Sequence, residues 1–181
     1  LIGTDHRWRL EHLGAGTRAQ FDRAARLGVY VSMAPFQYYY WGDLLDGEIF
    51  DHEHGSRWQS FADAVASGAV VSLHNDGSVS PPTPVLNIQT AVTRRTRAGN
   101  VHGAGQAISL DHALRAHTID AARTLHRETG TEHLCLAGGL LDLLRAEHAA
   151  ECRLDVLAQL VDDAVGANVD AFLRRHLADL R

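Results

Sequence analysis

Two residues that can bind a metal ion stand at the ends of two expected β-strands. His12 ends the segment Trp8–His12, and Asp76 follows the apolar segment Ala69–Leu73. A neutral imidazole nitrogen and a carboxylate are both ligands for Zn²⁺ and similar divalent ions. Water bound to such an ion loses a proton near neutral pH and becomes a nucleophile. Because Asp76 could bind the ion and also accept that proton, the pair points to metal-assisted hydrolysis.

Plainer roles stay open for the same residues. His12 can be a hydrogen-bonded histidine at the edge of a core, and Asp76, between Asn75 and Gly77, can cap a turn. His74 lies two positions before Asp76 and points to the same side if the strand continues that far. It can contact a substrate, support a metal ligand from outside, or pack as a polar residue.

The elements that must position these residues alternate between strands and amphipathic helices. Strands are expected at 8–12, 29–33 and 69–73, and helices at 18–27, 57–67, 84–97 and 110–125. Strands separated by helices are typical of an α/β fold with a parallel sheet. Because side chains alternate along a strand, Glu11 is expected to point away from His12.

Two helix termini carry clear local signals. Thr17 and Gln20 form a capping box, and Gly28 suits the left-handed residue that often follows a helix. At the other terminus, Arg94 and Arg95 fall in the expected last turn of a helix, where their charges suit the negative end of the helix dipole.

A long segment, residues 36–56, separates the second strand from the next helix and is expected to be a loop. Loops of that length in a compact domain are usually functional. Tyr39, Tyr40 and Trp41 near its start would contact substrate if the loop covers the ends of the strands. Otherwise they pack against the rim.

Composition narrows the classes of function. The 181 residues suffice for one sizeable core, and the net charge of −5 argues against nucleic acid as a partner. The chain has no lysine, which excludes Schiff-base and P-loop lysines from this segment, and its two cysteines do not form a CxxC pair. No apolar run approaches the roughly 20 residues of a membrane span. A cytoplasmic location is therefore expected.

Six segments come together in an order and spacing that carry more information than any one of them. They are Leu10–His12, Tyr39–Asp43, Ser72–Asp76, Pro81–Pro84, Ala91–Arg94 and Ala113–Ala122. Over residues 5–127 the chain resembles the amidohydrolase superfamily, and within it the amidohydrolase 3 group, which includes enzymes like N-substituted formamide deformylase.

The resemblance implies the C-terminal part of a (β/α)8 barrel, with strands six, seven and eight at 8–12, 29–33 and 69–74. His12 then matches the metal ligand of strand six. Asp76 matches the strand-eight aspartate, which contacts the metal and shuttles the proton. The implied cofactor is a divalent metal, zinc first, and the implied substrate is a small amide or formamide that a metal-bound hydroxide attacks.

The other ligands of the family, on strands one, four and five, would precede this chain. The chain is therefore expected to be truncated, to bind metal poorly alone and to lack activity by itself. Residues 1–127 are expected to form the barrel portion. Residues 128–181 are expected to form a divergent, helical tail, because their apolar residues follow helical spacing.

Two alternatives to an enzyme stay open. An incomplete barrel exposes strand edges, so the chain could be a non-catalytic half-barrel that associates with another chain, including a second copy of itself. It could also be a small-molecule binding module that uses the aromatic segment without hydrolysis. Ligand binding that does not depend on metal would favour the second.

Overall fold

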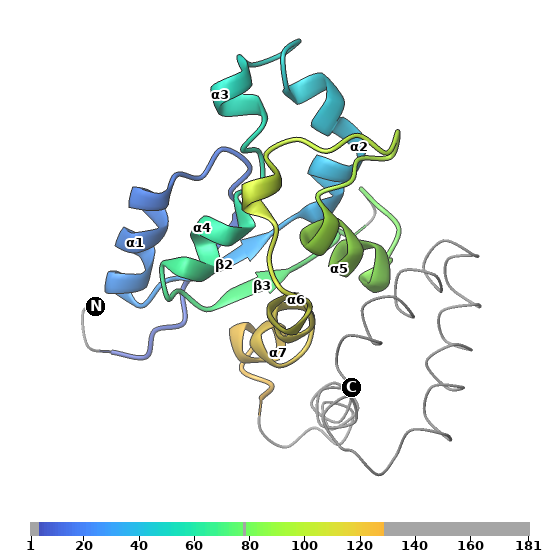
Figure 1. Ribbon diagram of the computed structural model, residues 1–181. Helices are drawn as coiled ribbons and strands as arrows, with labels where there is room; N and C mark the ends of the chain where they lie inside the picture. Colours follow the sequence, from blue (N-terminus) through green and yellow to red (C-terminus); the bar gives the residue numbers. More distant parts are fainter. Residues whose placement is uncertain (1–3, 78, 129–181) are drawn as a thin grey trace, which may run out of the picture.

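A three-stranded parallel sheet organises the part of the chain that the computed structural model describes, residues 4–77 and 79–128. The strands are β1 (Arg9–His12), β2 (Tyr30–Met33) and β3 (Val71–Leu73), in the order β1-β2-β3. Because all three are parallel, their carboxyl ends lie along one edge of the sheet (Figure 1). The α/β class and the three expected strands are confirmed. The expected helical tail, apart from residue 128, lies outside the described residues.

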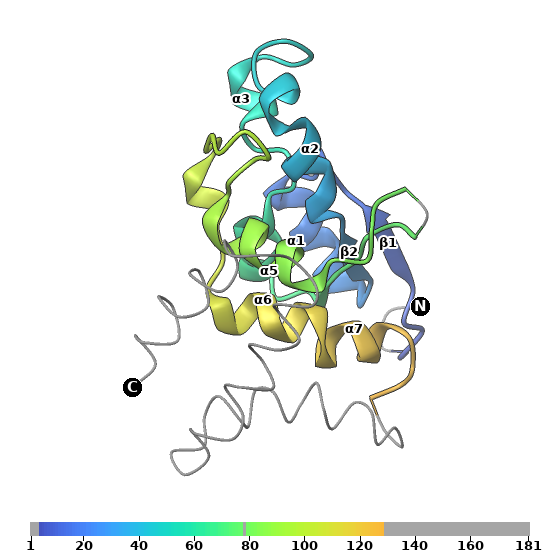
Figure 2. The same cartoon turned by 90° about the vertical axis from the view of Figure 1, so that its right-hand side faces the viewer.

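Helices follow each strand. They are α1 (Arg18–Leu27), α2 (Pro35–Leu45), α3 (His52–Gly55), α4 (Phe61–Ala66), α5 (Pro84–Thr93), α6 (Leu110–His117) and α7 (Ile119–Thr124), with a 3-10 turn η1 (Ala104–Gln106). Helix α1 packs against α4 and β2, whereas α6 and α7 pack against β3. Figure 2 shows α6 and α7 following each other end to end along the lower side of the described part of the chain.

The sheet has one apolar and one polar face. Val31 pairs with Val71 and Met33 with Leu73, and all four side chains are buried in the main hydrophobic core with residues from α1, α4, α5 and α6. On the other face, Glu11, Ser32 and Ser72 occupy one row of the register and line a pocket. Because the apolar face is buried in the core, Glu11, Ser32 and Ser72 on the opposite face are left facing the pocket.

Local signals correctly located the first helix. The Thr17 hydroxyl accepts from the Gln20 amide, the Gln20 side chain accepts from the Thr17 amide, and Gly28 ends the helix at φ 71°. Glycine adopts this left-handed conformation without the steric cost that a Cβ atom imposes.

The segment 36–56 is not the loop that the sequence predicted. Pro35 begins helix α2, and Tyr38, Gly42 and Leu45 are buried along one side of it at helical spacing. The run of aromatic residues obscured this pattern, because aromatic side chains favour strands and have poor helix propensity. Three further boundaries differ: α4 begins only at Phe61, α5 ends at Thr93 and not at residue 97, and Thr118, at φ −125° and ψ −96°, separates α6 from α7.

Arg94 is not an exposed partner of a helix dipole. It caps α5 at φ 53° and its side chain is fully buried, stacked 3.7 Å from the centre of the Tyr38 ring. Its guanidinium donates to the carbonyl oxygens of Ser56, Trp58 and Gln59 at 2.8–3.1 Å. Arg94 thus ties the end of α5 to the segment that precedes α4.

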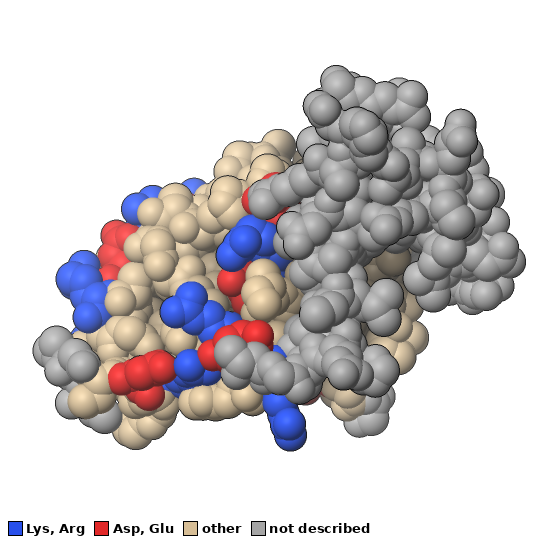
Figure 3. Space-filling view, turned by 90° about the horizontal axis from the view of Figure 1, so that it is seen from below, with Lys and Arg blue, Asp and Glu red and all other residues tan. Residues whose placement is uncertain are grey.

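Surface charges are mixed. On the face seen from below, arginine and acidic side chains are interspersed and do not gather by sign (Figure 3). Several form ion pairs, such as Arg18 with Asp22 at 2.7 Å and Arg115 with Asp120 at 3.4 Å. Within the described residues, none of the helices has the length and apolar character needed to cross a membrane.

Candidate metal centre

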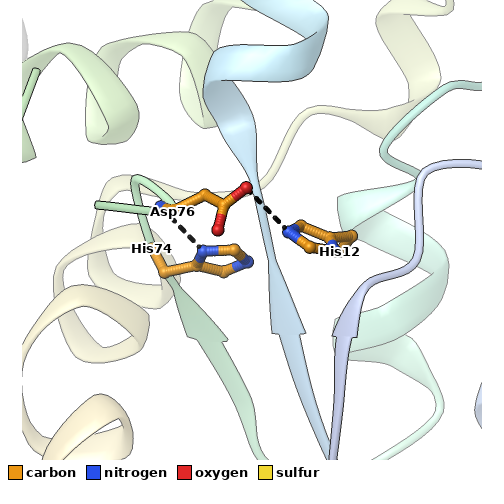
Figure 4. Close-up of side chains that lie close together, drawn as sticks. All are labelled: His12, His74 and Asp76. Atoms are coloured by element: carbon orange, nitrogen blue, oxygen red, sulfur yellow. Dashed lines mark hydrogen bonds and ion pairs between the residues drawn. The ribbon is translucent and has the colours of Figure 1, made fainter. Parts of the chain in front are cut away.

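His12, His74 and Asp76 converge at the carboxyl edge of the sheet (Figure 4). The Nε2 atom of His12 lies 3.2 Å from Oδ2 of Asp76, and the two imidazole rings are 5.1 Å apart. One ligand atom from each of the three residues lies within 4.8 Å of the others. The structure therefore brings together the two predicted metal ligands and His74, for which the sequence left a contact with substrate as one of three open roles.

An unusual backbone conformation directs His12 into this site. His12 has φ 69° and Leu13 has φ 52°, both in the left-handed region that non-glycine residues rarely adopt. Regular alternation would place His12 on the same face as Met33, its partner in the register. The left-handed turn interrupts that alternation, so Glu11 and His12 both line one pocket of about 390 Å³. The expectation that Glu11 points away was wrong.

The side chains present fit a divalent metal ion. The Nε2 atoms of His12 and His74 are buried and have no hydrogen-bond partner among the described residues, since the 3.2 Å contact of His12 with Asp76 lacks hydrogen-bond geometry. A buried polar atom without a partner is costly and indicates a missing ligand, ion or water. An imidazole nitrogen beside a carboxylate is a donor set that divalent metals accept.

His74 is held on two sides. Its Nδ1 accepts a hydrogen bond from the amide of Asp76 at 3.0 Å, and its Nε2 lies 3.7 Å from Oε2 of Glu11. Burial lowers the pKa of His74, and the charge of Glu11 only partly opposes this, so the imidazole is neutral at neutral pH. Arg9 in turn forms an ion pair with Glu11.

A buried amide network supports the turn that carries Asp76. Asn87 on α5 is 1% exposed and donates to Oδ1 of Asn75 at 2.8 Å. The hydroxyl of Ser80 donates to the carbonyl oxygen of Asn75 at 2.7 Å, and Asn87 also lies 3.2 Å from Nε2 of His117. These contacts fix the residue immediately before Asp76. The sequence offered one signal for them, since Asn87 and His117 are polar residues close to the apolar stripes of their helices.

Comparisons with known proteins bear on this site. Residues 3–134 match the sequence profile of the amidohydrolase family. The chain belongs to the amidohydrolase family. It is 32% identical over 134 residues to N-substituted formamide deformylase from Arthrobacter pascens, which agrees with the resemblance to the amidohydrolase 3 group.

Two solved structures are also similar. An uncharacterized metal-dependent hydrolase from Pyrococcus horikoshii OT3 superposes with a TM-score of 0.55 at 25% identity over 66% of this chain. A second one, from Pyrococcus furiosus, superposes with a TM-score of 0.52 at 24% identity and shows the shared fold. The alignment with the deformylase covers 72% of this chain. In all three comparisons this chain spans 24% of the relative's length.

The residues predicted to make aromatic contacts with a substrate lie elsewhere in this chain. Tyr39, Tyr40 and Trp41 are on α2, and none of them is among the residues that line the pocket. Trp41 packs edge-on against Phe36 at 5.9 Å, and Tyr40 is contacted by Arg97. Tyr40 and Trp41 are exposed. Their role in substrate binding stays a prediction, and the described residues do not bring them to His12 and Asp76.

Proposed function

We propose that this chain is part of a metal-dependent hydrolase that cleaves non-peptide carbon–nitrogen bonds in small amides, N-substituted formamides first. The convergence of His12 and Asp76 around an unpartnered imidazole nitrogen carries the proposal. Three similarities support it: membership of the amidohydrolase family, the likeness to the Arthrobacter deformylase and the likeness to the Pyrococcus horikoshii metal-dependent hydrolase.

We also propose that β1, β2 and β3 are strands six, seven and eight of a (β/α)8 barrel. Parallel strands with a helix after each, and chemistry at their carboxyl ends, support this arrangement. On this proposal the chain is the C-terminal portion of the enzyme, and further metal ligands come from strands outside it.

His12 and Asp76 would hold the metal, with zinc the proposed ion. When bound, a divalent ion polarises the carbonyl of the substrate and makes water nucleophilic near neutral pH. Both side chains are about two-fifths exposed, 42% for His12 and 40% for Asp76, and both line the pocket.

Asp76 has a second task in the proposed reaction. Its carboxylate accepts a proton from the attacking water and delivers it to the leaving nitrogen as the carbon–nitrogen bond breaks. A formamide and one water then yield formate and the free amine. The turn held by Asn75 and Asn87 keeps the carboxylate in place for both transfers.

A direct test measures formate release from an N-alkylformamide such as N-butylformamide, in the chain as purified and in the longer protein that contains it. We expect release that stops with a chelator, returns with Zn²⁺ and is lost in Asp76→Asn. Formate release that continues after complete metal removal would contradict the proposal.

A second candidate, association with another chain, rests on a separate observation. Trp8, just before β1, is 60% exposed and Leu10 on β1 is 46% exposed, and both line a groove of about 800 Å³ between β1 and α1. Most residues that line this groove are apolar, such as Leu27. An open strand edge beside apolar surface favours pairing. Light scattering on the purified chain tests this role: a monomer at all concentrations argues against it, and Leu10→Lys should shift any oligomer toward monomer.

A further inference from the structure

The hydrogen bond between Asp76 and His74 determines where the imidazole proton lies. A backbone amide can only donate, so Nδ1 of His74, 3.0 Å from the amide nitrogen of Asp76, accepts with its lone pair. In a neutral imidazole with Nδ1 unprotonated, the proton is on Nε2. The nitrogen that faces the pocket is therefore a donor.

We propose that His74 is not a third metal ligand, and that its Nε2–H donates a hydrogen bond to the carbonyl oxygen of the amide substrate. This role rests on the proposed hydrolase function. By distance alone Nε2 could bind the same ion as His12 and Asp76. A metal-binding histidine, however, offers one lone pair and donates its other ring N–H to an acceptor. His74 has the reverse arrangement, because its other nitrogen faces a donor.

His6 shows what the same local arrangement does elsewhere in this chain. The amide of Trp8, two residues later, donates to Nδ1 of His6 at 3.0 Å. The Nε2 of His6 lies 2.8 Å from the carbonyl oxygen of Leu27, and since a carbonyl only accepts, this nitrogen bears the proton. In His6, therefore, Nδ1 accepts a hydrogen bond from the amide two residues later, and Nε2–H donates one to a carbonyl oxygen.

The corresponding donor of His74 has no such partner. Its Nε2 is buried and makes no hydrogen bond within the described residues, and Oε2 of Glu11 at 3.7 Å is too distant for one. Figure 4 shows the ring of His74 extending beside the Asp76 carboxylate toward His12. A carbonyl oxygen at this position gains negative charge when water attacks its carbon, and a fixed N–H donor stabilises that charge.

The test uses the 181-residue chain labelled with ¹⁵N-histidine at alkaline pH. Long-range ¹H–¹⁵N spectra show which ring nitrogen bears the proton, and the variants His74→Gln and His6→Gln assign the two signals. We expect His74 and His6 to share the Nε2–H tautomer, and added Zn²⁺ to shift the His12 signal without changing the tautomer of His74.

Two results would overturn the proposal: a proton on Nδ1 of His74, or direct metal coordination that removes the Nε2 proton. If added Zn²⁺ shifts no histidine signal, the tautomer of His74 by itself decides whether the proposal stands. These readouts do not require turnover, so they judge His74 even if no formamide is hydrolysed, which would contradict the proposed function.

Kinetics in the active protein provide the second arm. His74→Ala removes the donor, and we expect kcat to fall by about 10²- to 10³-fold, the effect of losing one oxyanion donor, with metal content unchanged. Glutamine carries an N–H near the position of Nε2, so His74→Gln should recover most of the loss. Metal loss in both variants, as in His12→Ala, would make His74 a ligand and overturn the donor role.

Discussion

The Nε2 atom of His12 lies 3.2 Å from Oδ2 of Asp76, although His12 ends β1 and Asp76 follows β3, the two outer strands of the sheet with β2 between them. Both residues have left-handed backbone angles, φ 69° for His12 and φ 51° for Asp76. Such angles cost on the order of 1–2 kcal/mol for a residue with a Cβ atom. The surrounding turns, including the Asn87 contacts, hold this geometry in place.

Removal of the His12 imidazole should weaken metal binding. His12→Ala leaves Asp76 without its nitrogen partner, and we expect the Zn²⁺ dissociation constant to rise by more than about 100-fold, the upper end for supporting residues. Isothermal titration calorimetry measures this dissociation constant in wild type and in the variant. The matched control is His54→Ala on α3, since the His54 side chain is exposed and forms an ion pair with Asp51. The Zn²⁺ affinity of this variant should equal that of wild type.

Asp76→Asn keeps the size of the side chain but removes its charge and its ability to take a proton. We expect kcat for formamide hydrolysis to fall by about 10²- to 10⁴-fold, the usual range for a lost acid–base group. Initial rates of formate release at saturating Zn²⁺ test this. Asp22→Asn on α1, which removes a surface ion pair with Arg18, should leave the rate unchanged. Equal rates for both variants would exclude Asp76 from the reaction.

The buried Arg94 should be a main contributor to stability. Burial lowers its pKa to about 10, so the guanidinium stays charged at neutral pH. Arg94→Met leaves the carbonyl oxygens of Ser56 and Trp58 without a donor, whereas the carbonyl of Gln59 keeps the amide of Phe61. Each buried unpaired group costs about 1–3 kcal/mol, so we expect a loss of at least about 2 kcal/mol in the free energy of unfolding. Urea unfolding measures it.

The control for Arg94 is its neighbour. Arg95 is exposed and donates to the carbonyl oxygen of Gly99 at 3.0 Å. Arg95→Met should change the free energy of unfolding by no more than about 0.5 kcal/mol. Equal losses of unfolding free energy in the two variants would mean that the buried hydrogen bonds of Arg94 do not stabilise the fold more than the exposed contact of Arg95.

His102 should make stability depend on pH. Its Nδ1 lies 2.6 Å from Asp46 and its Nε2 2.8 Å from Asp43, and His52 also contacts Asp46. Burial alone would lower the pKa of His102, but hydrogen bonds to the two carboxylates outweigh it and raise the pKa above 6.5. Burial alone would raise the pKa of Asp43 and Asp46. Hydrogen bonds to the histidines outweigh burial and lower the pKa of both carboxyl groups below 3.8.

The signs follow from these directions. The His102 contribution is complete below pH 6.5 and is lost as the pH rises through the raised pKa. The carboxylate contribution is complete above pH 3.8 and is lost as the pH falls through the lowered values. Urea midpoints should therefore decline above pH 6.5, and His102→Gln should flatten that decline. The control is His112→Gln, because His112 is exposed. If this variant flattened the decline of the urea midpoint equally, the decline would not come from His102.

Several elements could be predicted from the sequence because their signals are local. The three strands are short apolar runs, and α1 carries its capping box and its terminal glycine. Helix α2 could not be predicted, since the aromatic residues that begin it favour strands, and only packing of Tyr38 and Leu45 into the interior makes that segment helical. Arg94 appeared as a surface charge because nothing local shows that Tyr38 would cover it.

The candidate site divides in the same way. The sequence by itself determined that an imidazole and a carboxylate, His12 and Asp76, follow strands of one parallel sheet. Only the tertiary structure decided that Glu11 and His74 join them, because the left-handed turn at His12 and the amide of Asp76 depend on how strands and turns pack. Residue order specifies which groups are available, whereas their mutual orientation depends on backbone angles that long-range packing selects.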